Sequence, residues 1–267
     1  MCLSILVILL FAAKSLLSKN INEIKDRPKA NLQFIDLNST FVNLTVGELE
    51  QVFTFALDTE LTYTWLPSNK STIAHTNNTY KCQDACEISD QVRSVDYKNI
   101  NITGVLTTDF FDFDLGDGMF KTIFLDALVD LSVLPSADGS IGLSPKSYKA
   151  ANETGIIESL QKASIINRPI VAFDYYRSRI RIGSEFEDDY MDRKNMEWVS
   201  IVENSSRWEI PIKSYKIGKT EITVPSTLII STAGSHLVVP NSAYELYTTE
   251  FMKTCKNSVK YIKTTHL

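Results

Sequence analysis

The sequence predicts a mainly β protein with a few helices. Strand-like runs, in which apolar and polar residues alternate and β-branched or aromatic residues are common, recur along the chain with turn residues between them. No segment shows a glycine-rich phosphate loop or the strand–helix alternation of parallel α/β folds. With 267 residues, 44% of them hydrophobic, the chain is long enough for one large domain or two smaller ones.

The predicted strands form two series, separated by a charged stretch at residues 185–195. This stretch has little apolar content, which favours a solvated loop that joins two lobes. Helical spacing of apolar residues predicts helices at residues 150–163 and 241–256. The predicted strands are residues 41–46, 51–57, 91–97, 105–115, 121–133, 170–176 and 179–182 before the loop, and 208–212, 216–217, 220–224 and 227–231 after it.

The N-terminus carries an apolar run from about Leu3 to Ala13, followed by small residues. The run is too short to span a bilayer and is typical of a secretory signal peptide at residues 1–19, although a positively charged start is missing. A buried helix is the alternative. We therefore expect a secreted, lysosomal or extracellular protein with no stable membrane span after removal of the signal.

Sequons for N-glycosylation and two cysteines agree with export. Cys82 and Cys86 are close enough to close a small disulfide loop in an oxidising compartment, whereas Cys255 is left unpaired. Seven N-x-S/T sequons indicate a secreted or lysosomal glycoprotein. They begin at Asn38, Asn43, Asn69, Asn77, Asn101, Asn152 and Asn204.

Charge and residue spacing argue against two kinds of partner. The net charge of −5 leaves no basic patch, so we expect no binding to nucleic acid. A CxxxC spacing alone is a weak metal motif, and neither His75 nor His236 completes a zinc-like spacing. The sequence predicts no metal and no cofactor.

The most informative stretch is residues 47–67, where a strand-like run leads into Asp58-Thr59. An Asp at the end of a hydrophobic strand is either a turn residue or a functional carboxylate. Here the stretch resembles the N-terminal active-site segment of pepsin-like aspartic peptidases, in which a G-x-P-x-Q strand enters D-T-G-S-x-x-x-W-V-P. The matching residues are Gly47, Gln51, Asp58, Thr59, Trp65 and Pro67, while Glu60 replaces the family's Gly and Leu61-Thr62 its small pair.

Further segments resemble the same family in the same order, so that the resemblance covers about residues 40–255. Tyr97, Gly104 and Asp109 resemble the hairpin that closes over substrate as a flap, although the family's intervening glycines are absent. Residues 137–143 resemble its D-G-I-x-G-L segment, and residues 179–183 and 208–212 resemble the strands that end the first lobe and open the second.

The resemblance implies a bilobal pepsin-like fold, with two β-barrel-like lobes and a cleft between them. The first lobe is expected at residues 20–185 and the second at 186–267. The family's second lobe runs on past the position of Cys255, so we expect the second lobe to be incomplete and truncated, with unpaired strand edges and poor stability or a partner.

The second active-site segment keeps its pattern but loses its carboxylate. Ser231-Thr232-Ala233 stand where the family repeats D-T-G, and Pro240 has the expected spacing. Aspartic peptidases hold two carboxyls so close that the pair shares one proton, and each acts as acid or base during peptide hydrolysis. A serine hydroxyl donates a hydrogen bond but does not titrate near neutral pH. We therefore expect a pseudoprotease in which catalysis is impaired.

The resemblance assigns the site residues. Asp58 is the retained catalytic carboxylate, and Ser231 stands at the position of the second Asp. An extended peptide or protein ligand would occupy the cleft between the lobes. The residues expected to contact it are Tyr97, Trp65, Thr59 and Thr232.

Two alternatives stay open, so whether the chain is an enzyme is uncertain from sequence. An active acid endopeptidase would use an unusual pair, Asp58 with Glu60 or with Ser231 through water. A Glu at position 60 must either point into a crowded centre or force the loop open, because Gly suits close backbone approach. The other alternative is a non-enzymatic secreted glycoprotein with a vestigial cleft. Serine hydrolase chemistry at Ser235-His236 is a weaker idea, because no G-x-S-x-G elbow surrounds it.

Overall fold

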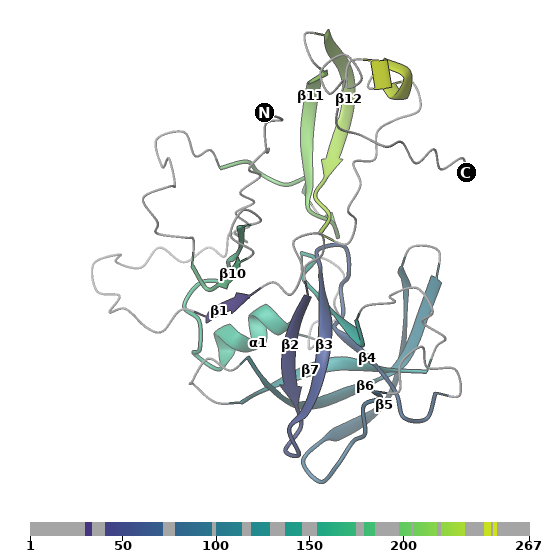
Figure 1. The fold of residues 1–267 in the computed structure, drawn as a ribbon, viewed down its shortest axis with the longest axis vertical. Coiled ribbons are helices and arrows are strands. Elements are labelled where there is room, and N and C mark those ends of the chain that lie inside the picture. Colours follow the sequence, from purple (N-terminus) through teal and green to yellow (C-terminus); the bar gives the residue numbers. More distant parts are fainter. Residues whose placement is uncertain are drawn as a thin grey trace.

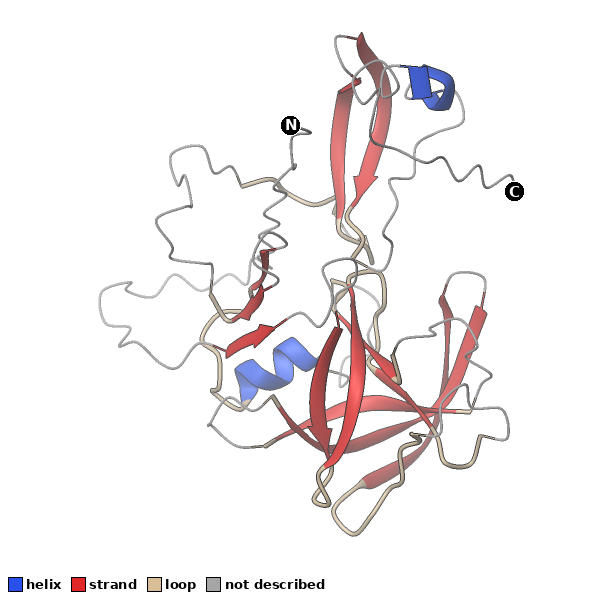
Figure 2. Ribbon diagram, in the orientation of Figure 1, coloured by secondary structure: helices blue, strands red, loops and turns tan. Residues whose placement is uncertain are grey.

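The computed structural model is mainly β, as the sequence predicts (Figures 1 and 2). Within the described residues, no helix is long and apolar enough to cross a membrane. Residues 1–29, 185–197 and 250–267 lie outside the description, and with them the predicted signal peptide, the charged loop at residues 185–195 and the end of the chain. The structure describes residues 30–33, 41–71, 78–97, 100–113, 119–128, 137–145, 154–174, 179–184, 198–203, 205–217, 220–232, 243–246 and 248–249.

A seven-stranded sheet makes up most of the molecule, with strand order β2-β3-β8-β4-β7-β6-β5. An additional pairing of β2 with β6 curls the sheet back on itself. The pairs β3–β8 and β4–β7 are parallel, whereas the other pairs are antiparallel. The strands are β2 (Phe41–Val46), β3 (Gln51–Asp58), β4 (Trp65–Pro67), β5 (Glu87–Tyr97), β6 (Ile100–Asp112), β7 (Phe120–Ala127) and β8 (Gly139–Gly142).

The alternation in β3 explains why this strand forms and where it lies. Phe53, Phe55 and Leu57 are buried on one face, whereas Val52 on the other face is 58% exposed. A period of two is what a strand with one buried face requires. The buried side packs against an aromatic core in which the Phe55 and Phe111 ring centroids lie 5.9 Å apart. Burial of this face carries the chain directly to Asp58.

Two glycines of β8 let the chain after Asp58 cross the sheet at close range. A Cβ atom on Gly139 would lie 2.3 Å from the carbonyl oxygen of Trp65, and one on Gly142 would lie 2.6 Å from the carbonyl carbon of Tyr63. Only glycine fits where backbones approach so closely. The D-G-x-I-G order at residues 138–142 is therefore needed to pack β8 between β3 and β4.

A small second sheet has the order β1-β10-β9, with β1 (Ala30–Gln33), β9 (Val171–Asp174) and β10 (Arg179–Ile182). The β9–β10 hairpin agrees with the sequence prediction, but β1 was not predicted, because residues 20–40 gave no clear strand pattern. Its register pairs Ala30 with Ile182. The N-terminal segment thus joins the last hairpin of the first strand series.

One helix, α1 (Ile156–Lys162), packs beside β7. Ile156 and Leu160 are buried, and the hydroxyl of Thr122 on β7 donates to Ser159 Oγ over 2.9 Å. The helix begins later than the predicted residues 150–163, although positions 146–153 lie outside the described residues.

The last hairpin, β11 (Glu209–Ile217) and β12 (Thr220–Ile229), stands away from the seven-stranded sheet in Figure 1. Each strand is continuous, whereas the sequence predicted two short strands in each place. The predicted gap at residues 225–226 contains Pro225, which lies where the register shifts between Ile212 and Ser214. A proline has no N–H to donate, and at such an irregularity none is needed.

Candidate active site

Asp58 is the last residue of β3 and is almost fully buried, with 1% of its surface exposed. Its carboxylate oxygen Oδ1 accepts a hydrogen bond of 2.8 Å from the backbone N–H of Glu60. Its carbonyl oxygen accepts one of 2.8 Å from the N–H of Leu143, just after β8. The side chain is thus oriented by its own loop while its backbone is tied to the sheet.

Two threonines join the loop after β3 to the loop after β12. The backbone N–H of Thr59 donates to Thr232 Oγ1 over 3.1 Å, and the N–H of Thr232 donates to Thr59 Oγ1 over 3.0 Å. Each hydroxyl then donates onward across the junction, from Thr59 to the Ile230 carbonyl over 2.9 Å and from Thr232 to the Leu57 carbonyl over 2.6 Å. We call residues 57–60 the Asp58 loop and residues 230–232 the Ser231 loop.

This reciprocal pairing fixes the place of Ser231. The residues on both sides of Asp58 bond to Thr232 and Ile230, which flank Ser231. Asp58 and Ser231 are therefore equivalent positions of two facing loops. The sequence singled out both positions but did not predict the hydrogen bonds between the loops. The signal that could have predicted these bonds is the threonine at the second position of each motif, Thr59 and Thr232.

Glu60 turns into this centre. The hydroxyl of Ser231 donates a hydrogen bond to Glu60 Oε1, and the Glu60 residue is partly buried. The sequence left two outcomes open: Glu60 points into a crowded centre, or it forces the loop open. The structure shows the first, since the side chain points inward while the loops stay joined through Thr59 and Thr232.

The long hairpin of β5 and β6 carries Tyr97 next to its tip, in register with Ile100. The tip residues Lys98 and Asn99 and the Tyr97 side chain lie outside the description. Trp65 is 1% exposed, in a cluster with Leu61 and other apolar residues. A contact between its ring and a peptide would require these neighbours to move. For Thr59 and Thr232, the hydroxyls are already used in the pairing of the loops.

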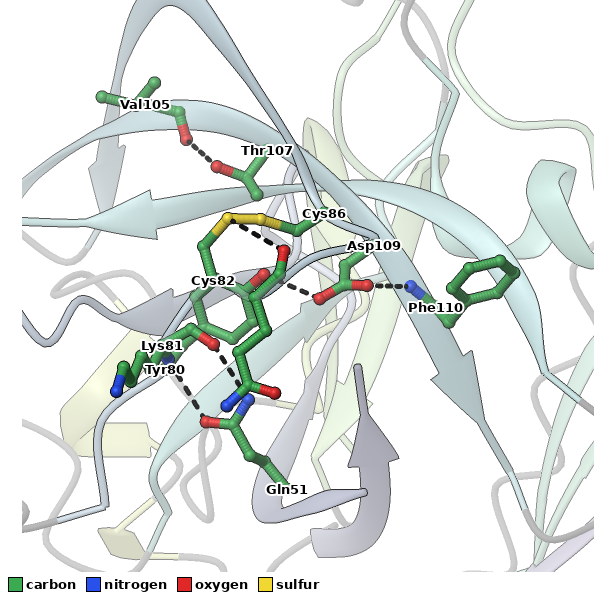
Figure 3. The surroundings of a disulfide bond; sticks show 10 residues. Gln51, Tyr80, Lys81, Cys82, Cys86, Val105, Thr107, Asp109 and Phe110 are labelled. Carbon is green, nitrogen blue, oxygen red and sulfur yellow. Dashed lines mark hydrogen bonds between the residues drawn. A yellow bond between two sulfur atoms is a disulfide. The ribbon is translucent and has the colours of Figure 1, made fainter. Parts of the chain in front are cut away.

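Under the sheet, a polar network ties the chain around residue 80 to strands β3 and β6 (Figure 3). The Tyr80 hydroxyl donates to Asp109 Oδ2 over 2.7 Å, and the N–H of Phe110 donates to Asp109 Oδ1 over 2.8 Å. Burial, followed by the hydrogen bond to Asp109, raises the pKa of Tyr80 well above its usual range. Gln51 holds the same segment, since its side chain donates to the Lys81 carbonyl over 3.0 Å.

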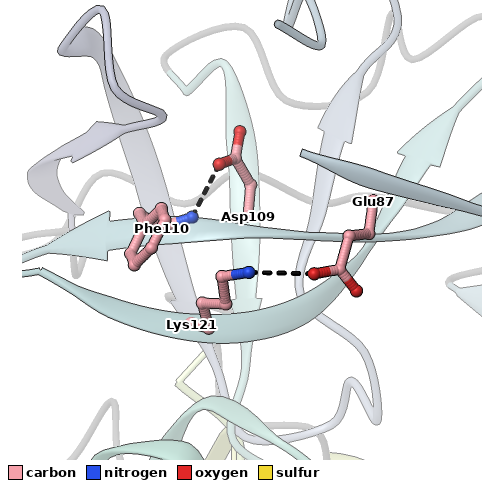
Figure 4. A network of polar contacts seen from close by, with 4 residues as sticks. All are labelled: Glu87, Asp109, Phe110 and Lys121. Atoms are coloured by element: carbon pink, nitrogen blue, oxygen red, sulfur yellow. Dashed lines mark hydrogen bonds and ion pairs between the residues drawn. The ribbon is translucent and has the colours of Figure 1, made fainter. Parts of the chain in front are cut away.

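Cys82 and Cys86 follow directly and are brought together, with Cα atoms 5.7 Å apart, a separation typical of disulfides (Figure 3). On the outer surface, Lys121 of β7 pairs with Glu87 of β5 over 2.9 Å, spanning the strand that carries Asp109 and Phe110 (Figure 4). Both partners of this ion pair are exposed, so its contribution to stability is small.

Asp126 of β7 is another buried carboxylate, with 5% of its surface exposed. Burial raises its pKa above the ordinary value, while a hydrogen bond from the Ser68 side chain and the charge of Lys70 oppose this shift. Its burial could not be predicted from the sequence, because an Asp in a strand-like run gives no sign of which face it occupies.

Part of the remaining sequence predictions can be placed in the structure. Asn43, Asn69 and Asn101 are exposed, as N-glycosylation requires, and the other sequons, His75, His236 and Cys255 lie outside the described residues. The described ranges contain no group of three or more His, Cys, Asp or Glu side chains that could hold a metal ion.

The family model described as eukaryotic aspartyl protease matches residues 39–264. The match covers most of the chain and spans both the Asp58 loop and the Ser231 loop. The chain therefore belongs to the eukaryotic aspartyl protease family, whose pepsin-like members are peptidases acting on peptide substrates. No curated protein sequence matches this chain directly.

Proposed function

We propose that this protein is a secreted pepsin-like aspartic peptidase homologue that binds extended peptides between its two active-site loops but hydrolyses them poorly. The observation that carries this proposal is the pairing of Thr59 with Thr232, which sets Ser231 opposite Asp58. The frame of a two-carboxylate centre is thus kept, and one carboxylate is replaced by a hydroxyl.

The chemistry explains the loss of rate. Hydrolysis at such a centre needs an ionised carboxylate that takes a proton from water and a protonated partner that donates to the peptide carbonyl. General acid–base help is worth roughly two to four orders of magnitude per group. Ser231 can donate a hydrogen bond but cannot exchange a proton with Asp58 near neutral pH. It also removes the second negative charge that would raise the pKa of one member of the pair.

Binding of a statine-containing hexapeptide, measured by calorimetry at acid pH, tests the proposal. The statine hydroxyl is a donor that suits the Asp58 carboxylate, so we expect binding that Asp58→Asn weakens at least about tenfold, the order of one charge-assisted hydrogen bond. Asp90→Asn, at an exposed position of β5, is the matched control. If the unaltered protein shows no binding, there is no working cleft, and the non-enzymatic glycoprotein becomes the better description.

A second candidate is an active acid endopeptidase in which Glu60 supplies the missing carboxylate. The hydrogen bond from Ser231 to Glu60 favours it, because a carboxylate does stand beside the second position. This candidate predicts acid cleavage of peptides that Glu60→Gln abolishes, since the amide keeps the acceptor oxygen but cannot titrate.

The proposed location is an oxidising compartment, extracellular or lysosomal. A disulfide between Cys82 and Cys86 and glycans on exposed sequons such as Asn69 support it. The family is commonly secreted or lysosomal, and the N-terminal residues 1–19 have the pattern of a signal peptide.

A further inference from the structure

Hydrogen bonds of the backbone around Glu60 and one bond of its side chain direct this residue into the centre. Its backbone N–H donates to Asp58 Oδ1 over 2.8 Å, and the preceding Thr59 is bonded on both its N–H and its hydroxyl to the Ser231 loop. Its carboxylate accepts the hydrogen bond of Ser231. The backbone on which Glu60 sits is therefore fixed, and the side chain crosses from one loop to the other.

The contact changes which hydrogen bonds the centre can offer. A serine hydroxyl carries a single hydrogen, and that of Ser231 is directed to Glu60 Oε1. Ionised carboxylates accept hydrogen bonds and do not donate them. A peptide carbonyl needs a donor, and when Asp58 and Glu60 are both ionised the Ser231 hydroxyl is the side chain at this junction that can supply it. With Glu60 in place, the Ser231 hydroxyl already donates its hydrogen to Glu60 Oε1.

We propose that Glu60 determines what the centre can accept: by holding the Ser231 hydroxyl, it withholds the hydrogen bond that a peptide carbonyl would take up opposite Asp58. The centre then favours ligands that bring their own donor, such as a hydroxyl, over an ordinary peptide bond. This inference rests on the proposed function, because it assumes that extended peptides reach the centre.

The test is binding of two fluorescent hexapeptides of the same sequence, one with a central statine hydroxyl and one with an ordinary central peptide bond. We expect Glu60→Gly to bind the ordinary peptide about tenfold more tightly than the unaltered protein, the order of one hydrogen bond gained in a shielded site. The gain must vanish in the double variant Glu60→Gly with Ser231→Ala, which has no hydroxyl to release. Glu60→Gln keeps an acceptor oxygen and should stay within about threefold of the unaltered protein.

The controls separate this inference from the proposed function. Glu48→Gly, at an exposed position in the turn after β2, should leave both affinities unchanged. Equal affinity of the unaltered protein and Glu60→Gly for the ordinary peptide overturns the inference while the cleft stands. A gain that survives Ser231→Ala also overturns it, because Glu60 would then act through its bulk. If no folded variant binds either peptide, both the inference and the proposed function fail.

Discussion

At the scale of single residues, position in the fold decides what each carboxylate does. Asp58 ends β3 and is 1% exposed, in a loop that is bonded to the Ser231 loop, whereas Asp126 lies within β7 and is 5% exposed. Asp109 lies on the neighbouring strand and is satisfied by the Tyr80 hydroxyl and a backbone N–H. Similar side chains thus stand at the proposed site, within a buried strand and in a polar network.

Asp126 predicts a stability that depends on pH. Burial raises its pKa in the folded protein, so its protonated form favours folding; this contribution is present below the pKa of the unfolded state and is lost as pH rises through the folded value. Asp126→Asn should therefore raise the free energy of unfolding at neutral pH and change it little at acid pH.

Urea denaturation at the two pH values measures this effect. Asp90→Asn, at an exposed position of β5, is the matched control and should show no such difference. A variant at Asp126 that is equally destabilised at both pH values would contradict the expectation, since the carboxylate would then be held by contacts that the amide cannot make.

The sequence indicates which residues form the proposed site better than it indicates which contacts they make. Asp58 and Ser231 could be predicted because motif spacing is a property of the chain. The hydrogen bond between Ser231 and Glu60 could not, because it joins side chains 171 positions apart and depends on how the two loops face each other. The burial of Trp65 was missed for a similar reason, since an aromatic residue at a strand start suits a cleft wall and a core equally well.

At the scale of elements, the junction of the Asp58 loop and the Ser231 loop holds the site. Thr232→Val keeps the side-chain shape but removes a hydroxyl that bonds to the Thr59 N–H and the Leu57 carbonyl, all of them buried. Leaving these groups unpaired should lower the free energy of unfolding by about 1–3 kcal/mol.

Chemical denaturation of this variant checks the expectation, with Thr220→Val as the control at an exposed position of β12. Loss of statine-peptide binding is expected together with the loss of stability, because the two loops lose their common register. If Thr232→Val were as stable as the control, the reciprocal pairing would not be what holds the loops together.

Strands with a clear alternation of apolar and polar residues could be predicted closely, whereas a strand whose place depends on a distant partner could not. The range of β2 is the predicted one, and β3 extends only to include Asp58, since alternation marks both strands clearly. By contrast, β1 pairs with β10 in the described part of the chain, so its place depends on a partner 146 or more positions away. In β12, the predicted gap at residues 225–226 is wrong, because the strand continues through the irregular point of the hairpin.

At the scale of the whole molecule, the last hairpin is attached to the seven-stranded sheet at a few defined points. The indole N–H of Trp208 donates to the Leu143 carbonyl over 2.8 Å, and the Ile230 N–H donates to the Trp208 carbonyl over 3.0 Å. Together with the Thr59–Thr232 pair, these bonds place the Ser231 loop over the end of β8. The position of Ser231 is therefore set by the hydrogen bonds between the last hairpin and the seven-stranded sheet rather than by its own side chain.

From this arrangement we infer that the frame of a peptidase centre is kept while its second carboxylate is lost. If the frame is intact, returning the missing groups should return the chemistry. Ser231→Asp supplies the second carboxylate, and Glu60→Gly removes the side chain that now bonds to that position. The backbone N–H that orients Asp58 is unchanged by the second substitution.

The most direct measurement is the rate of peptide cleavage at acid pH by the double variant Ser231→Asp with Glu60→Gly, compared with the unaltered protein. We predict a gain of at least about two orders of magnitude, the contribution of one acid–base group, which Asp58→Asn removes again. Cleavage by the unaltered protein at a rate equal to that of the double variant would contradict the claim that Ser231 impairs catalysis. A folded double variant without any cleavage would contradict the claim that the frame of the centre is intact.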